Sequence, residues 1–369
     1  MKVSHVGRSA AVLAIGALAL TACGSDNATG NTNSGGGSGE SSGVSGTLTG
    51  IGASSQQAAM TAWQNGFQSA NSGSTVQYSP DGSGAGRKAF LAGGANFAGS
   101  DAYLSDDEVE QAKQQCGPDG AMDLPVYISP ISVAFNLPGI ESLNLDAPTI
   151  AKIFKGEITK WNDDAIKAEN EGTDLPEKDI TVIFRSDESG TSANFQKFLK
   201  AATGDWNSEG KQFPDSVGEG ANGSSGVADQ VASIDGAITY VEAGFADQKE
   251  GEGVKKAKID FGHGPVELST ESVNKALENL EFKKTDSEHN MVVDSEALFS
   301  SDNEGAYPLI LTTYNIVCSK GYDEETSKLV KSFFTTVLDH QDDQLAEQGF
   351  IPVEGAHLDK LKAAVDALQ

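Results

Sequence analysis

Seven consecutive residues near the middle of the chain carry groups that could hold an anion. Residues 185–191 read Arg-Ser-Asp-Glu-Ser-Gly-Thr, so the guanidinium of Arg185 lies close to two hydroxyls, Ser189 and Thr191, that flank Gly190. An arginine fork pairs with oxyanions through two parallel hydrogen bonds, and the free N–H groups of a helix start favour negative charge. Taken alone, the segment is more often an ordinary helix N-cap formed by Ser189 or Thr191.

The flanking sequence places this segment between a strand and a helix. The apolar run 180–184 predicts a buried strand, and Phe195, Phe198 and Leu199 recur at helical spacing. A strand, a polar turn and a helix in that order would aim backbone N–H groups, hydroxyls and the guanidinium at one point.

Two earlier turns repeat this arrangement. A strand at 48–52 leads into Ser54 and Ser55, a strand at 76–78 leads into Ser83, and a helical pattern follows each turn. The alternation of strands and helices indicates an α/β fold with parallel sheets, in which such turns gather at the carboxyl ends of the strands. Three hydroxyl-bearing turns and an arginine therefore favour one anion site over three unrelated caps.

A carboxylate, Asp101, follows the short stretch 97–100 and is expected to join these donors. It would repel a bare anion, but it can accept a proton from an anion that carries one, as phosphate does. Sulfate brings no proton at neutral pH, and a site built around one hydrogen bond rejects a ligand lacking it by ~10⁴–10⁵-fold. Without other support, an acid at such a turn is more commonly structural.

Composition limits the classes of partner. The 369 residues suffice for two domains or one large two-lobed domain. The formal net charge of -27 argues against nucleic acid and anionic lipid, which need a basic surface. It does not exclude a small anion, because salt screens charges beyond roughly 8 Å. The five histidines show no ligand spacing, and we expect no metal or other cofactor.

The N-terminus predicts export and anchoring. A basic start precedes the apolar run 10–20, which is too short to span a bilayer, and Leu-Thr-Ala then leads into Cys23. This matches a bacterial lipobox, so we expect a signal peptide at 1–22 and lipidation of Cys23 with palmitate; a plain secretory signal is the alternative. Residues 23–46, rich in Gly, Ser, Asn and Thr, would tether a body at the outer face of the cytoplasmic membrane.

Two cysteines remain for the body. Cys116 and Cys318 would lie in a compartment that permits disulfides. They either pair, which would tie an early loop to a late strand, or remain two isolated thiols. The sequence leaves both alternatives open.

Further short motifs run in order along the body from about residue 50 to the end. They are GIGAS at 50–54, GS at 82–83, FAGSD at 97–101, VAFNLPG at 133–139, IFKG at 153–156, WND at 161–163, RSDESGT at 185–191, GAITYVE at 236–242 and YPL at 307–309. This series resembles the periplasmic phosphate-binding proteins, the substrate-binding component of Pst-type phosphate ABC importers.

The resemblance implies a fold and a function. The fold would be a two-lobed, type II-like periplasmic-binding-protein fold whose hinge is two crossing strands near Val133 and Pro308. Lobe 1 would comprise 47–132 plus 308–369, and lobe 2 would comprise 133–307. The function would be capture of inorganic phosphate and delivery to the permease subunits of an ABC importer. The resemblance implies a binding protein rather than an enzyme; we expect a monomer that touches the membrane only through its lipid.

The resemblance also implies a ligand set. The phosphate ligands would be Ser54, Ser55, Ser83, Asp101, Arg185, Ser189, Gly190 and Thr191, with Asp187 orienting the arginine. Two positions depart from the family pattern: Ser55-Gln56 stands where Phe-Pro is usual, and Glu188 stands where glycine is common. The second departure adds an acid near the site.

Three other interpretations stay open. A receptor for another tetrahedral oxyanion, such as sulfate, would use the same donors. A phosphatase could use Asp187 as nucleophile, but this chemistry needs Mg²⁺, a lysine and further acids, and we find no second acidic motif. A dinucleotide site could start at Gly82, but Arg87 occupies the position of its last glycine.

Overall fold

The computed structural model describes residues 44–278, 280–287, 289–299 and 303–369. The predicted signal peptide, Cys23 and nearly all of the tether lie outside the described residues. Within these ranges, no helix is both long enough and apolar enough to cross a bilayer.

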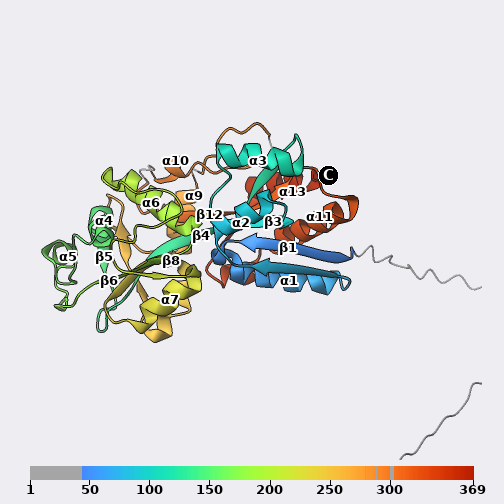
Figure 1. The fold of residues 1–369 in the computed structure, drawn as a ribbon. Helices are drawn as coiled ribbons and strands as arrows, with labels where there is room; N and C mark the ends of the chain where they lie inside the picture. Colours follow the sequence, from blue (N-terminus) through green and yellow to red (C-terminus); the bar gives the residue numbers. More distant parts are fainter. Residues whose placement is uncertain (1–43, 279, 288, 300–302) are drawn as a thin grey trace, which may run out of the picture. The chain divides into compact units, whose positions relative to one another are not determined.

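A mixed sheet with the strand order β2-β1-β3-β12-β4-β8-β6-β7 runs through the body, and β9 and β13 both pair with β4 (Figure 1). A second sheet has the order β11-β10-β5. The strands are β1 Gly46–Gly52, β2 Ser74–Ser79, β3 Phe97–Ser100, β4 Ala121–Asn136, β5 Asn144–Asp146, β6 Thr181–Arg185, β7 Glu219–Ala221, β8 Ala237–Glu242, β9 Lys255–Lys256, β10 Lys258–Asp260, β11 Pro265–Val266, β12 Ile310–Cys318 and β13 Ile351–Pro352.

Helices follow most of the parallel strands. They are α1 Gln57–Ala70, α2 Ser83–Leu91, α3 Asp106–Cys116, α4 Ala147–Lys155, α5 Asp164–Glu169, α6 Gly190–Thr203, α7 Gly223–Ser233, α8 Ala243–Asp247, α9 Thr270–Leu277, α10 Ser295–Phe299, α11 Glu324–Asp339, α12 Asp343–Ala346 and α13 Gly355–Asp366, with 3-10 turns at Ser54–Gln56 and Glu250–Glu252.

The expectation of parallel sheets is only partly correct. β1 pairs in parallel with β2 and β3, and β6 pairs in parallel with β7 and β8. β12 instead runs antiparallel to β3 and β4, and β4 runs antiparallel to β8. Strand–helix alternation revealed the parallel pairs, whereas β12 and β4 come together from distant parts of the chain.

β4 is the strand that links the two halves of the sheet. Its first part pairs with β12 as far as Pro130, and its second part pairs with β8 from Ile131 onward. β4 starts as early as Ala121, because β12 extends far enough for Cys318 to pair with Ala121.

The glycine-rich residues 218–226 contain both a strand and the start of a helix. β7 pairs in parallel with β6, and α7 already begins at Gly223. Glycine has low helix and strand propensities, and the parallel pairing with β6 overrides them here. The helix start at Gly223 places Ser224 in the first turn of α7.

Two hydrophobic clusters make up most of the core. One lies among α1, α11 and α13 and includes Trp63, Phe97 and Phe333. The other lies around α4 and α6 and includes Trp161 and Phe195. Figure 1 shows these two groups of helices toward opposite ends of the large sheet.

The division into lobes 47–132 plus 308–369 and 133–307 stays a proposal. β4 passes from one cluster to the other at its change of partner, and Leu309 O accepts a hydrogen bond from Ile131 N–H at 3.0 Å beside that point. Phe282 and Met291 pack against the first cluster although they belong to the segment 133–307.

Cys116 at the end of α3 and Cys318 at the end of β12 form a disulfide in the structure. Both side chains are buried, against Phe90, Leu104 and Ile316. The bond therefore joins the end of α3 to the end of β12, a strand that lies between β3 and β4 in the large sheet.

We expect this disulfide to stabilise the fold. It joins residues 202 positions apart, and closing a loop of that length in the unfolded chain contributes roughly 2–5 kcal/mol. The double variant Cys116→Ser/Cys318→Ser should unfold at lower urea concentration than the oxidised wild type. Adding a reductant should destabilise only the wild type; equal midpoints for both proteins would contradict the prediction.

Asp123 on β4 should make stability depend on pH. Its side chain is 1% exposed, and burial raises the pKa of Asp123 to about 7, although the Leu104 N–H and Arg87 oppose this. A carboxyl whose folded pKa lies above its unfolded value of 3.8 binds its proton more tightly when folded. Stability should therefore fall as pH rises from about 4 to about 7, by up to ~1.4 kcal/mol per pH unit for this group.

The variant Asp123→Asn should show a shallower fall over that range, measured by urea unfolding at several pH values. Exposed Asp164 provides the matched control, because Asp164→Asn makes the same chemical change on a fully exposed side chain. Parallel curves for Asp123→Asn and wild type would show that Asp123 does not titrate in this way.

Candidate functional site

Arg185 is the last residue of β6 and is 3% exposed. Its Nε donates to Asp187 Oδ1 at 2.7 Å and its Nη2 donates to Asp187 Oδ2 at 2.5 Å. Nη1, on the other edge of the guanidinium, faces Ser224 Oγ at 3.2 Å and Thr191 Oγ1 at 3.5 Å. Asp187 therefore fixes the plane of the guanidinium and leaves one edge pointing at the hydroxyls.

The electrostatics match this geometry. Burial alone would raise the pKa of Asp187, but the hydrogen bonds and charge of Arg185 and the N–H of Gly223 lower it overall. Burial would lower the pKa of Arg185, and Asp187 and Glu242 reverse that effect. Both partners are thus charged, as a buried ion pair requires.

The start of α6 supplies the predicted Ser-Gly-Thr. Ser189 is fully buried and its Oγ accepts from Ser192 N–H at 3.2 Å, so it is the N-cap. Thr191 Oγ1 donates to Glu242 Oε1 at 2.5 Å. The N-cap interpretation thus describes Ser189 correctly, and because the cap uses a lone pair of its oxygen, its O–H remains a donor.

Asp101 lies at the end of β3 with its two oxygens in different surroundings. Oδ1 accepts from Ser55 Oγ at 2.7 Å and from Thr313 Oγ1 at 3.0 Å. Among the residues that the structure describes, the hydrogen-bond partner of Oδ2 is Ser83 Oγ at 3.4 Å, and that hydroxyl also accepts from Asp101 N–H at 3.1 Å. Oδ2 is therefore the oxygen with capacity to accept a further proton.

Burial, and after it the charge of Glu242, raises the pKa of Asp101 to about 7, against the lowering effect of the hydrogen bonds from Ser55 and Thr313. Asp101 is 6% exposed. The group therefore exchanges a proton near neutral pH, which suits a carboxylate that must accept one from a ligand.

The predicted residues of the early turns lie against the part of the cluster that surrounds residues 185–191. Ser54 Oγ accepts from Ser224 N–H at 3.0 Å and lies 3.2 Å from Ser224 Oγ, across 170 positions of sequence. A Cβ on Gly190 would lie 2.4 Å from Asp101 Cβ and 2.8 Å from Ser83 Oγ, so only glycine allows this approach. All the predicted ligand residues thus lie in one buried cluster.

Three members of the cluster were not predicted as ligands: Ser224, Glu242 and Thr313. Ser224 follows β7 and Glu242 ends β8, so both obey the strand-end rule that found the others. Thr313 lies within β12 and reaches Asp101 only through the antiparallel pairing of β12 with β3 and β4. The sequence holds no local signal for it.

At both departures from the family pattern, the structure shows what the side chains contact. Glu188 turns away from the cluster, because Lys88 Nζ contacts both its carboxylate oxygens at 2.8 Å. Its backbone carbonyl accepts from Gly84 N–H at 3.2 Å. Gln56 is buried and its side-chain amide donates to Tyr314 O at 2.8 Å, while the Ser55 hydroxyl donates to Asp101 Oδ1.

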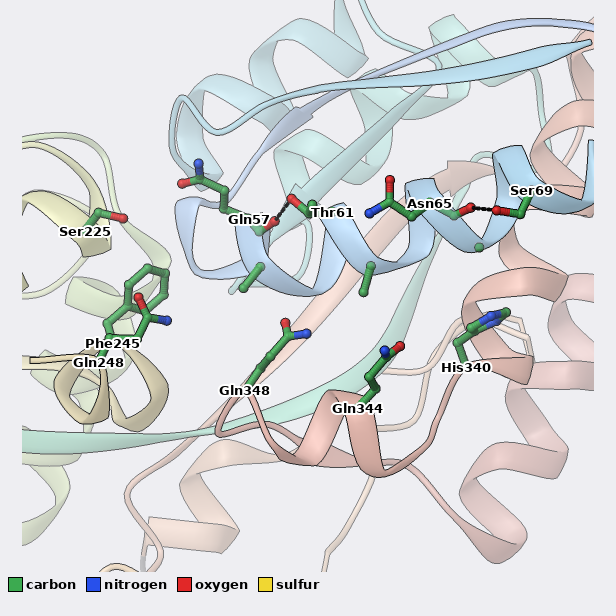
Figure 2. A pocket seen from close by; sticks show the side chains of 13 residues that line it. Gln57, Thr61, Asn65, Ser69, Ser225, Phe245, Gln248, His340, Gln344 and Gln348 are labelled. Atoms are coloured by element: carbon green, nitrogen blue, oxygen red, sulfur yellow. Dashed lines mark hydrogen bonds between the residues drawn. The ribbon is translucent and has the colours of Figure 1, made fainter. Parts of the chain in front are cut away.

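A separate hollow of about 670 Å³ lies beside α1 and α12 (Figure 2). Its thirteen lining residues include Gln57, Gln248, Gln348 and His340, whose side chains Figure 2 shows around the opening. None of the thirteen is a predicted site residue, and none is Asp, Glu, Lys or Arg. The hollow therefore has no Lys or Arg to hold an anion and shares no residue with the cluster.

A family model described as "PBP superfamily domain" matches residues 37–339. The phosphate-binding protein PstS 3 of Mycobacterium leprae is 39% identical over 375 residues, which is all of both chains. PstS 2 of Mycobacterium tuberculosis is also 39% identical over all of both chains, and PstS of Xylella fastidiosa is 30% identical over 83% of this chain and 81% of its own. The chain belongs to the PstS family of phosphate-binding proteins, within the PBP superfamily.

Solved structures agree on the PBP fold. A phosphate-binding protein from Stenotrophomonas maltophilia has a TM-score of 0.62 at 22% identity and covers 86% of this chain and 94% of its own. A high-affinity periplasmic phosphate-binding protein solved with phosphate has a TM-score of 0.67 at 21% identity over 86% of this chain and 93% of its own. The predicted two-lobed periplasmic-binding-protein fold is thereby confirmed as the fold of this PstS-family chain.

The contact at Gly190 predicts a specific cost of a small substitution. Gly190→Ala would push its Cβ into Asp101, and such overpacking costs typically ~1–3 kcal/mol. We expect a lower thermal midpoint for Gly190→Ala. Gly226 in the first turns of α7 is the matched control, since its added Cβ would touch only Ala221 at 3.8 Å. Gly226→Ala should unfold at the wild-type midpoint or above it, because Ala has the higher helix propensity. Equal midpoints for both variants would show that a Cβ at position 190 fits against Asp101 without strain.

Proposed function

We propose that the buried cluster binds one inorganic phosphate ion and that the chain delivers it to the permease subunits of an ABC importer. The observation that carries this proposal is a carboxylate, Asp101, among the hydroxyls, the helix-start N–H groups and Arg185. A carboxylate in an anion site is useful only if the anion brings a proton. The relatives at 39% identity are named phosphate-binding proteins, which supports the same ligand.

Each ligand residue has a role in this proposal. Arg185 Nη1, the hydroxyls of Ser54, Ser83, Ser189 and Thr191, and backbone N–H groups at Ser55, Gly190 and Thr191 would donate to phosphate oxygens. Asp101 Oδ2 would accept the phosphate proton, because Ser55 and Thr313 already occupy Oδ1. In a buried cluster these bonds are stronger than in water, because the local dielectric is low.

This assignment distinguishes phosphate from the other oxyanions. Sulfate has the same shape but no proton for Asp101 at neutral pH, so it would leave two negative groups in contact. A receptor for sulfate would have no use for this carboxylate. The donors alone fit both ions, and Asp101 is the residue that favours phosphate.

The chain is a binding protein and performs no reaction on its ligand. Asp187, the nucleophile of the phosphatase interpretation, has both carboxylate oxygens on Arg185, and Oδ1 also accepts from Gly223 N–H at 3.1 Å. A carboxylate held in that way cannot approach a phosphorus atom. Its role is to orient the guanidinium.

Phosphate would enter between two lobes that then close on it. Lobe 1 (47–132 plus 308–369) contributes Ser54, Ser83 and Asp101, and lobe 2 (133–307) contributes Arg185 and the start of α6. The contact of Ser54 with Ser224 supports a closed arrangement. The hinge would be the change of partner along β4 and the chain entering β12, as in other two-lobed receptors.

The protein would act in the cell envelope. Residues 1–22 would be removed as a signal peptide, Cys23 would carry the palmitate, and residues 23–46 would tether the body at the outer face of the cytoplasmic membrane. The acidic composition, with a formal net charge of -27, supports a monomer in which only the lipid contacts the membrane and which binds no nucleic acid.

Calorimetric titration of the purified protein with phosphate and then sulfate at neutral pH tests the proposal. We expect phosphate to bind at least ~10³-fold tighter than sulfate, since the discrimination available from one buried hydrogen bond reaches ~10⁴–10⁵. Asp101→Asn should lose most of that preference, because its amide can no longer accept the phosphate proton as a charged group. Equal affinities for the two ions in wild type would contradict the assignment of Asp101, and no heat with phosphate would refute the function.

A further inference from the structure

Glu242, the last residue of β8, is a carboxylate that the proposed ligand set does not use. Its side chain is fully buried. Oε1 accepts from Thr191 Oγ1 at 2.5 Å, and Oε2 is buried with no hydrogen-bond partner among the described residues. A charged oxygen buried without a partner costs several kcal/mol, so this group calls for an explanation.

The Thr191 hydroxyl has a single proton, so it cannot donate to Glu242 and to an anion at the same time. A threonine hydroxyl has one proton to donate and two lone pairs. When Thr191 gives that proton to Glu242, its oxygen faces Arg185 Nη1, 3.5 Å away, only as an acceptor. If Thr191 instead donates to an anion, Glu242 Oε1 also loses its donor unless Glu242 carries a proton.

Charged and titratable groups act on Glu242 from three other elements. Asp101 follows β3, Arg185 ends β6, and Tyr127 lies on β4. After the larger effect of burial, the charge of Glu242 raises the pKa of Asp101, and it contributes to raising that of Arg185. It is a smaller contributor to the raised pKa of Tyr127. Arg185 is the one cation of this set and is already paired with Asp187, so another anion must be accommodated against two carboxylates, Asp101 and Glu242.

We propose that Glu242 is a positioning residue that takes up one proton when phosphate binds and thereby turns Thr191 into a hydrogen-bond donor. The proton comes from the solvent. Protonated Glu242 donates a hydrogen bond to Thr191 Oγ1, and the Thr191 hydroxyl then donates a hydrogen bond to a phosphate oxygen. This inference rests on the proposed function, since it assumes that the ligand is phosphate.

Proton uptake can be measured directly. Phosphate is titrated calorimetrically in two buffers of different ionisation enthalpy at one pH, and the difference in heat gives the number of protons bound. We expect wild type to take up more protons than Glu242→Gln, with a difference approaching one. The amide N–H of the glutamine can donate to Thr191 as the acid would, so Glu242→Gln should still bind phosphate.

The same variant predicts a change in pH dependence. As the pH rises, the affinity of wild type relative to Glu242→Gln should fall, by at most ~10-fold per pH unit, the limit for one linked proton. The ionisation of phosphate itself cancels in this ratio because both proteins meet the same ligand.

Two further variants serve as controls. Asp123→Asn removes another buried carboxyl, 1% exposed and outside the cluster, and should keep the proton count of wild type. Thr191→Val keeps Glu242 but removes the hydroxyl between it and the ligand. Thr191→Val should therefore bind phosphate more weakly and take up fewer protons than wild type when it binds. If Glu242→Gln does not fold, the proton count of Thr191→Val tests the role of Glu242 instead.

The outcomes separate this inference from the function on which it rests. Equal proton counts and parallel pH profiles for wild type and Glu242→Gln overturn the role of Glu242 while leaving phosphate binding intact. The wild-type proton count in Thr191→Val also overturns it. A wild type that gives no heat with phosphate refutes the proposed function instead.

Discussion

The buried ion pair between Arg185 and Asp187 is the interaction on which the rest of the site depends. A guanidinium that is 3% exposed is costly unless it is paired and hydrogen-bonded. Asp187 meets that requirement with two oxygens and is itself held by the N–H of Gly223 at the start of α7. The pair therefore fixes the guanidinium and also links the ends of β6 and β7, so that Ser224 and Thr191 come to lie on the remaining edge of the arginine.

The second constraint is the close approach of two segments that are far apart in sequence. Gly190 leaves no room for a side chain against Asp101, and Ser54 contacts Ser224. Such contacts bring the carboxyl ends of two parallel groups of strands, β1 with β3 and β6 with β8, to one place. β4 and β12 make this possible, because they run antiparallel to the strands on either side of them.

The charge balance of the cluster follows from its task. One guanidinium stands among three carboxylates, Asp101, Asp187 and Glu242, in a site proposed for an anion. This arrangement makes sense if protons are part of recognition, since a ligand that shares its proton with Asp101 lowers the repulsion. Selectivity would then come from the carboxylates, whereas affinity would come from the hydroxyls, the N–H groups and Arg185.

The sequence by itself determined the strand-to-helix turns and the family, and it predicted the anion-binding character of residues 185–191. These features are local: an apolar run, a polar turn and a helical period lie within a few residues of one another, and the motif series kept its order along the chain. Only the tertiary structure decided that Thr313 joins the cluster, that Glu188 turns to Lys88, and that Cys116 meets Cys318. Each of these contacts joins residues far apart in sequence, so it depends on strand order, on antiparallel pairing and on the packing of α2, α6 and α7, which no local pattern of residues encodes.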